Sequence, residues 1–144
     1  MKTKSFQQQI DDGQLCVAIR EAEQNTSGEI RVFISRFPTT DPLADARREF
    51  DRLGMKRTPL RNAVLLYFAP ESQQFAIIGD ENIHFRCGEA FWKAVAGEME
   101  AELKHGRITA AILAGIQRAG LELARHFPRQ AGDRDDLPNT VERN

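Results

Sequence analysis

The chain has 144 residues, of which 41% are hydrophobic, and its 20 Lys and Arg residues nearly balance its 21 Asp and Glu residues. This length suits one domain that buries roughly two-thirds of its unfolded surface. With a formal net charge of -1, the chain has no overall field to attract nucleic acid or an anionic membrane, so we expect neither as a specific partner. The sequence shows neither the apolar run of a signal peptide nor the ~20 apolar residues that span a bilayer, so we expect a cytoplasmic protein.

The first elements predicted along the chain are a helix and a strand. Asp11 or Asp12 can cap the helix, because the apolar residues that follow recur at helical spacing. Residues 25–28 have the composition of a turn. Residues 29–36 are rich in β-branched side chains that alternate with polar ones, which predicts the first strand.

A second helix and a hairpin are predicted next. Asp41 is a good N-cap, Pro42 suits the first helical position, and Gly54 suits the C-terminal stop. Residues 63–68 are apolar without alternation, as in a strand covered on both faces. A short turn then leads to another strand at residues 75–78, which must pair antiparallel, whereas the helical crossover favours parallel pairing of the first two strands.

The remaining pattern predicts two helices. Apolar residues recur at helical spacing over residues 88–104 and again over residues 108–127, with Gly106 as the stop between them. Gly115 lies inside the second of these helices, where glycine costs about 1 kcal/mol relative to alanine. We therefore expect close packing at Gly115.

These elements predict a single α/β domain over residues 1–128. The expected architecture is a three-layer α/β/α sandwich with a small mixed sheet, in which a parallel strand–helix–strand unit is joined to an antiparallel hairpin, and with C-terminal helices. Residues 129–144 are polar, and we expect a loosely held tail. Its only expected docking points are Leu137, Pro138 and Val141.

The predicted chain direction gathers polar residues at one end of the sheet. The first two strands run parallel and begin at the same end, and the third strand returns antiparallel and finishes there. We call the residues that this brings together the polar cluster. They are Thr26, Glu29, Arg61, Asn62, Asp80 and Glu81.

The polar cluster can do different things. Carboxylates that converge with amide oxygens suit Ca²⁺ or Mg²⁺, so Asp80, Glu81 and Glu29 are the candidate metal ligands. A cation held there beside Arg61 could bind a phosphate. The candidate ligand-binding residues are accordingly Asn62, Arg61 and Thr26. Alternatively, Arg61 pairs with Asp80 or Glu81 across the end of the hairpin and only organises the structure.

A second feature is basic. Arg48, Arg52 and Lys56 form one stripe, which we call the basic stripe. The stripe is either a solvated face, partly offset by Glu49 and Asp51, or an electrostatic patch for a phosphate or an acidic partner. No aromatic residue is interleaved on the exposed side of the stripe, so specific nucleic-acid binding is only weakly supported.

Three segments, residues 22–32, 61–66 and 76–80, have the order and spacing of motifs in a known family. The chain resembles the TPM domain family, known from thylakoid-lumen proteins and many bacterial proteins. The resemblance implies an α/β sandwich. Because some relatives are described as acid phosphatases or as Ca²⁺ binders, it also implies an acidic site, whose matched positions here are Asn62 and Asp80.

The chain departs from this family pattern at the polar cluster. Arg61 stands where many relatives have an acidic residue, and replacing an acidic ligand by a cation weakens divalent-metal binding. No nucleophile–base pair is recognisable. We therefore expect an interaction or regulatory module whose partner is a protein or a phosphorylated ligand. The alternatives are a divalent-cation-dependent phosphatase acting on phosphomonoesters, and an obligate homodimer that buries surplus apolar residues such as Phe37, Phe85 and Trp92.

Overall fold

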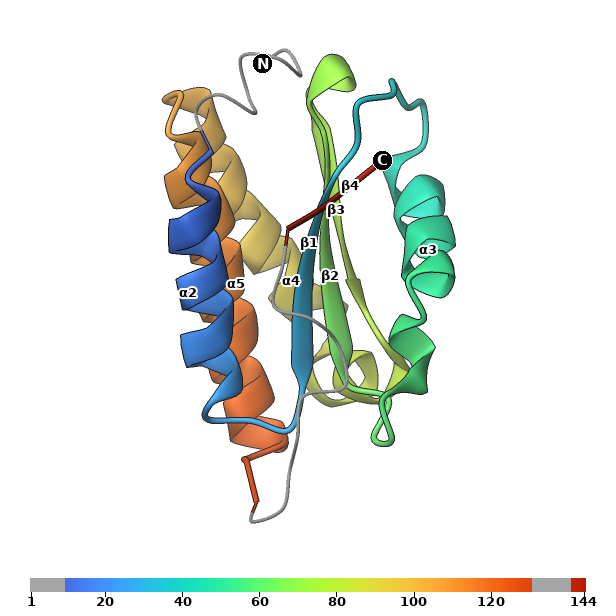
Figure 1. The fold of residues 1–144 in the computed structure, drawn as a ribbon, viewed down its shortest axis with the longest axis vertical. Coiled ribbons are helices and arrows are strands. Elements are labelled where there is room, and N and C mark those ends of the chain that lie inside the picture. Colours follow the sequence, from blue (N-terminus) through green and yellow to red (C-terminus); the bar gives the residue numbers. More distant parts are fainter. Residues whose placement is uncertain (1–9, 131–140) are drawn as a thin grey trace.

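The computed structural model describes residues 10–130 and 141–144 of the chain. The elements in this part are helices and strands in mixed order, as Figure 1 shows. They are α2 (Asp12–Glu23), β1 (Glu29–Ile34), α3 (Pro42–Arg52), β2 (Ala63–Ala69), β3 (Gln74–Gly79), α4 (Glu81–Lys104), α5 (Ile108–His126) and β4 (Val141–Arg143), with short 3₁₀ helices at Met55–Arg57 and Pro70–Ser72. Within these described ranges, no helix combines the length and the apolar character that crossing a bilayer demands.

The four strands form one mixed sheet in the order β3-β2-β1-β4. β1 pairs parallel with β2, and β2 pairs antiparallel with β3, which confirms both predicted pairings. The sequence pattern does not predict β4, which pairs parallel with β1 and places Val141 beside Val32. The other expected docking points of the tail, Leu137 and Pro138, lie outside the described residues.

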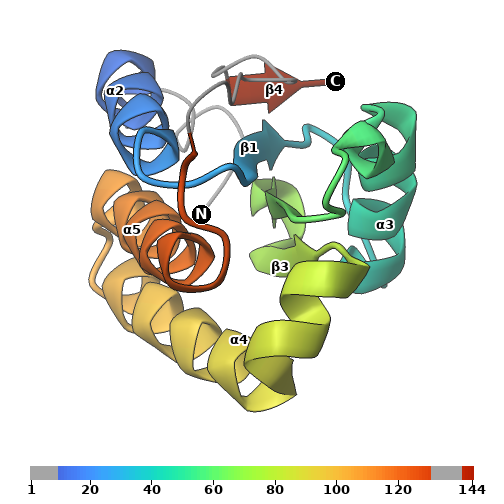
Figure 2. The same cartoon turned by 90° about the horizontal axis from the view of Figure 1, so that it is seen from below.

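Helices cover both faces of this sheet, as Figures 1 and 2 show. On one face, Val32 and Leu66 lie in a core shared with α2, α4 and α5. On the other face, Phe33 and Tyr67 stack with their ring centroids 5.7 Å apart and lie in a core with Phe50 of α3. Successive strand residues point to opposite faces, so a strand buried on both faces can lose its polar alternation. The expected three-layer α/β/α sandwich is confirmed.

The local signals at α2 and α3 act as predicted. The side chain of Asp11 accepts a hydrogen bond from the N–H of Gln14 at 3.0 Å, and Asp41 accepts one from the N–H of Ala44 at 3.1 Å. Each bond satisfies a donor that has no partner inside the helix. Beyond α3, Gly54 has φ of 72°, the left-handed conformation that glycine adopts without strain.

The start of α4 differs from the prediction. The sequence pattern begins this helix at Gly88, but the observed helix begins at Glu81, and Asp80 is its N-cap. Gly88 interrupts it with φ of 80° and ψ of 167°, which bends the chain. Residues 81–87 form a first segment that the apolar spacing of the longer segment does not include.

Glycines bring α5 close to its neighbours. A Cβ atom on Gly115 would lie 2.8 Å from the sulfur of Met99 in α4, so the predicted close packing at this glycine is confirmed. A Cβ atom on Gly120 would lie 2.7 Å from the Cβ of Ala22 in α2. The Met99 side chain is flexible and can move, whereas the Ala22 Cβ is fixed to its backbone.

The different surroundings of Gly120 and Gly97 predict opposite effects of the same substitution. Gly120→Ala is expected to lower the free energy of unfolding by about 1–3 kcal/mol, because α2 and α5 must separate. Gly97→Ala is expected to raise it by about 0.5–1 kcal/mol, because position 97 is in an exposed helix interior with nothing within 4 Å of the added atom. Urea unfolding measures both. Equal effects at the two positions would contradict the helix packing described here.

Candidate functional site

The polar cluster assembles at the end of the sheet where β1 and β2 begin. Glu29 is the register partner of Ala63, and Gly79 is the partner of Val64. The N–H of Asp80 donates to the carbonyl of Ala63 at 2.9 Å. Asn62, just before β2, and Asp80, just after β3, therefore lie at the same end of the sheet, as the chain direction requires.

Asp80 is held by Arg61. The Nε and Nη2 atoms of Arg61 each donate to one carboxylate oxygen of Asp80 at 2.8 Å. The Oδ1 atom of Asp80 also accepts the N–H of Glu81 at 2.8 Å, which caps α4. The hydrogen bonds that Arg61 donates to Asp80 raise the pKa of Arg61 above its ordinary value. Of the interpretations that the sequence left open, this contact is the ion pair across the end of the hairpin.

The three candidate metal ligands occupy different surroundings. Asp80 and Glu29 are buried, whereas Glu81 is exposed and lies 3.2 Å from Arg61. Among residues 10–130 and 141–144, no group of three or more His, Cys, Asp or Glu side chains could hold a metal ion. Metal binding by Asp80, Glu81 and Glu29 therefore stays a prediction, and these three side chains do not form a cluster of metal ligands in the described residues.

Asn62 and Thr26 are buried and hold loops together. The side-chain amide of Asn62 donates to Ser27 Oγ at 3.3 Å, and its backbone N–H donates to Thr58 Oγ1 at 3.3 Å. The hydroxyl of Thr26 donates to the carbonyl of Phe127 at 2.5 Å and accepts the N–H of Gly28 at 3.0 Å. These contacts account for both side chains structurally, and a ligand role for them stays a prediction.

The basic stripe is neutralised by nearby carboxylates. Each of its members makes an ion pair with a residue three to five positions before it. The pairs are Arg48 with Asp45 at 2.7 Å, Arg52 with Glu49 at 2.6 Å and Lys56 with Asp51 at 3.0 Å. Such exposed pairs leave little net field for a partner. The solvated-face interpretation accounts for this arrangement, and binding of a partner by the stripe remains untested.

The exposed apolar surface is smaller than the homodimer alternative predicts. Phe85 is 83% exposed and Phe37 is 52% exposed, but Trp92 is only 8% exposed. The indole of Trp92 packs on β3, where a Cβ atom on Gly79 would lie 2.8 Å from its Cζ2 atom. Trp92 is therefore buried within the domain and is not available to a second subunit.

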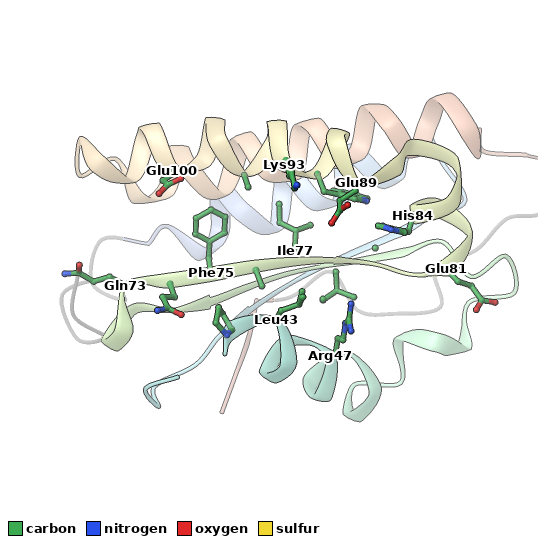
Figure 3. Close-up of a pocket in the computed structure, with 17 residues that line it drawn as sticks. Leu43, Arg47, Gln73, Phe75, Ile77, Glu81, His84, Glu89, Lys93 and Glu100 are labelled. Carbon is green, nitrogen blue, oxygen red and sulfur yellow. The ribbon is translucent and has the colours of Figure 1, made fainter. Parts of the chain in front are cut away.

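A groove of about 620 Å³ runs along β3 between α3 and α4, and we call it the edge groove. Figure 3 shows Leu43 and Arg47 of α3 on one side of the strand and Glu89 and Lys93 of α4 on the other. β3 is the outer strand of the sheet and is only half-buried along its length. The edge groove thus has a strand edge at its centre and a helix on each side.

The hydrogen-bond pattern shows which groups of β3 face the edge groove. Asp80 bonds to Ala63, so in this antiparallel pair alternate residues before Asp80 also bond toward β2. The N–H and C=O groups of Phe75, Ile77 and Gly79 consequently point away from β2. In the described part of the chain, no group bonds to them.

Sequence reasoning missed the edge groove, although one signal for it was present. The third predicted strand had a predicted neighbour on one side only, which makes it an edge strand. The groove also needs the positions of α3 and α4, which become visible only in the folded structure. Trp92 and Ala96, one helical turn apart on α4, line its second wall.

Comparisons with known proteins give the family. The family model of the TPM domain matches residues 5–121. The NMR structure of the BA42 protein from the psychrophilic bacterium Bizionia argentinensis is similar, with 37% sequence identity, a TM-score of 0.85 and coverage of 92% of each chain. The N-terminal domain of the cg2496 protein from Corynebacterium glutamicum shares the fold, with 21% identity and a TM-score of 0.56 over 74% of this chain and 67% of that one. A search of curated proteins finds no match. On the family model and the BA42 structure together, this chain belongs to the TPM domain family.

Proposed function

We propose that this domain is a protein-interaction module that binds an extended segment of a partner protein along the open edge of β3. The observation that carries the proposal is the row of outward N–H and C=O groups on Phe75, Ile77 and Gly79 inside the edge groove. An added strand would satisfy these groups by main-chain hydrogen bonds, which give affinity in strand addition.

The shape of the edge groove supports a single strand as the guest. β3 has six residues, which corresponds to about 20 Å of strand. Natural proteins usually protect long edge strands against pairing with other sheets. Here α3 and α4 stand on either side, so one extended segment fits more easily than the edge of a second domain with its own covering helices.

The groove can be tested with unbiased peptides. A random heptapeptide library is selected against the whole chain, and the recovered peptides are measured on two arginine variants of α4. Ala96→Arg places a long cation in the edge groove, whereas Ala94→Arg makes the same change on an exposed position of the same helix. We expect binding to Ala94→Arg as to wild type and at least a tenfold loss with Ala96→Arg. Equal binding to the two variants, or no recovered peptide, would contradict the proposal.

Hydrogen exchange tests the binding mode. In the free domain we expect the amides of Ala76 and Ile78 to exchange more slowly than those of Phe75 and Ile77, because only the first pair donates to β2. A bound peptide should slow Phe75 and Ile77. Two versions of the peptide are then compared, one N-methylated at its odd-numbered amides and one at its even-numbered amides. Only one of these two sets of amides faces β3, so one version should lose binding and the other should bind as the unmodified peptide does. Equal effects of the two methylation patterns would exclude strand addition.

The phosphatase alternative depends on the polar cluster, in which Asp80, Glu81 and Glu29 would be the metal ligands. Divalent-cation chemistry there would require Asp80 to leave Arg61. A cation that binds the folded state raises the melting temperature by mass action. Because Asp80 is already paired with Arg61, we expect millimolar Ca²⁺ or Mg²⁺ to leave the melting temperature unchanged. A rise in wild type that Asp80→Asn abolishes would instead favour a metal-dependent phosphatase.

A further inference from the structure

We infer that the segment bound in the edge groove carries a carboxylate side chain on the face turned toward α3, two residues away from an apolar side chain. This inference rests on the proposed function and names the chemistry of its partner. It follows from the charge and the spacing of the side chains on the α3 wall.

Arg47 differs from the other basic residues of α3. Arg48 and Arg52 each make an ion pair within α3, with Asp45 and Glu49 respectively. Arg47 lines the edge groove, and in the ranges that the structure describes it makes no ion pair. An exposed guanidinium in a groove is available for a carboxylate, which can accept two of its hydrogen bonds at once.

The spacing on α3 matches that of an added strand. Leu43 and Arg47 are one helical turn apart, a rise of about 6 Å. Side chains on the same face of a strand recur every two residues, or about 6.7 Å. Figure 3 shows Leu43 and Arg47 in this order along the direction of β3. If an apolar side chain of the bound strand lies opposite Leu43, the side chain two residues further along the strand therefore lies opposite Arg47.

The other face of the bound segment would lie against α4. Phe75 and Ile77 of β3 lie with Trp92 in the core on this side, and Ala96 completes an apolar lining. The charged residues of this wall are of both signs. They are Glu81, Glu89, Lys93 and Glu100. The guest residues that face α4 are therefore apolar, and the selectivity for charge comes from Arg47.

The test uses two peptides and their charge-reversed partners. Thr-Val-Leu-Val-Glu-Val-Thr presents valines to one helix and the Leu and Glu side chains to the other, and Thr-Val-Glu-Val-Leu-Val-Thr does so for the opposite strand direction. Each is compared with the peptide in which Lys replaces Glu. We expect wild type to bind the Glu peptide of one direction about fivefold or more tightly than its Lys counterpart.

Charge reversal on the protein provides the decisive comparison. Arg47→Glu should reverse the preference and favour the Lys peptide. Arg48→Glu, the same change at the neighbouring exposed position, should leave the preference for Glu intact. A preference that Arg48→Glu reverses and Arg47→Glu does not would overturn the inference.

The remaining outcomes separate this inference from the proposed function. If the Glu and Lys peptides bind wild type equally and Ala96→Arg weakens both, the acidic selectivity is wrong while the groove still binds extended segments. If no designed peptide binds in either direction, the inference is also overturned. The unbiased library then decides the proposed function independently.

Discussion

Asp80→Ala is expected to lower the free energy of unfolding by about 2–3 kcal/mol. The carboxylate of Asp80 is buried, caps the first turn of α4 through Glu81, and is bound through both oxygens by Arg61. Loss of an N-cap costs about 1 kcal/mol, and removing one partner of a buried pair costs more. Urea unfolding followed by circular dichroism measures the change.

Two matched variants separate the contributions of Asp80. Asp80→Asn keeps a good N-cap but removes the charge, so it should cost less than Asp80→Ala. Glu81→Ala changes the exposed neighbour and should alter stability by no more than about 0.5 kcal/mol. If Asp80→Ala were as stable as wild type, the contact with Arg61 would not organise this end of the sheet. The Asp80 carboxylate of the wild-type protein would then be available to a ligand.

Glu142→Ala is expected to lower the free energy of unfolding by about 2 kcal/mol. Glu142 of β4 makes an ion pair with Arg31 of β1, whose side chain is only 6% exposed. Removing the partner of a buried charge typically costs 3–5 kcal/mol. Glu142 is partly exposed, so water compensates for some of this cost. Thermal and urea unfolding of the full chain measure the loss.

Arg143→Ala is the matched control in the same strand. Arg143 pairs with Asp12, but both side chains are substantially exposed, and such pairs contribute about 0.5 kcal/mol. Equal losses for Glu142→Ala and Arg143→Ala would mean that β4 as a whole detaches in both variants. The buried pair with Arg31 would then not be what holds this strand.

The parts of the fold that sequence predicts are those with local signals. Asp41, Pro42 and Gly54 define α3 within a few residues, because capping and helix termination act over one turn. The predicted start of α4 was wrong because the local signal at Asp80 is ambiguous. The sequence places Asp80 in a cluster of carboxylates, and an aspartate can either cap a helix or bind a cation.

β4 shows what a local pattern cannot give. It has three residues, of which only Val141 is apolar, and it pairs with residues more than 100 positions earlier in the chain. Its position depends on Arg31, a charged residue in the middle of a buried strand. A pattern that assigns arginine to the surface gives no reason to place a partner strand there.

The candidate sites divide in the same way. Chain direction alone was sufficient to bring Asn62 and Asp80 to one end of the sheet. The choice between a metal ion and Arg61 depends on side-chain placement, and Arg61 adopts φ of 51°, a conformation uncommon for residues other than glycine. The edge groove depends on two helices that are separated in sequence by two strands, so only the tertiary structure reveals it.

The arrangement of the two outer strands has a consequence for how the domain associates. The short strand β4 lies along one border of the sheet, and α3 and α4 flank the opposite border. Sheets that grow into fibrils need borders that can stack freely on identical copies. This domain should therefore remain monodisperse at high concentration while still accepting one guest, and light scattering with and without a saturating peptide would show a stoichiometry of one to one.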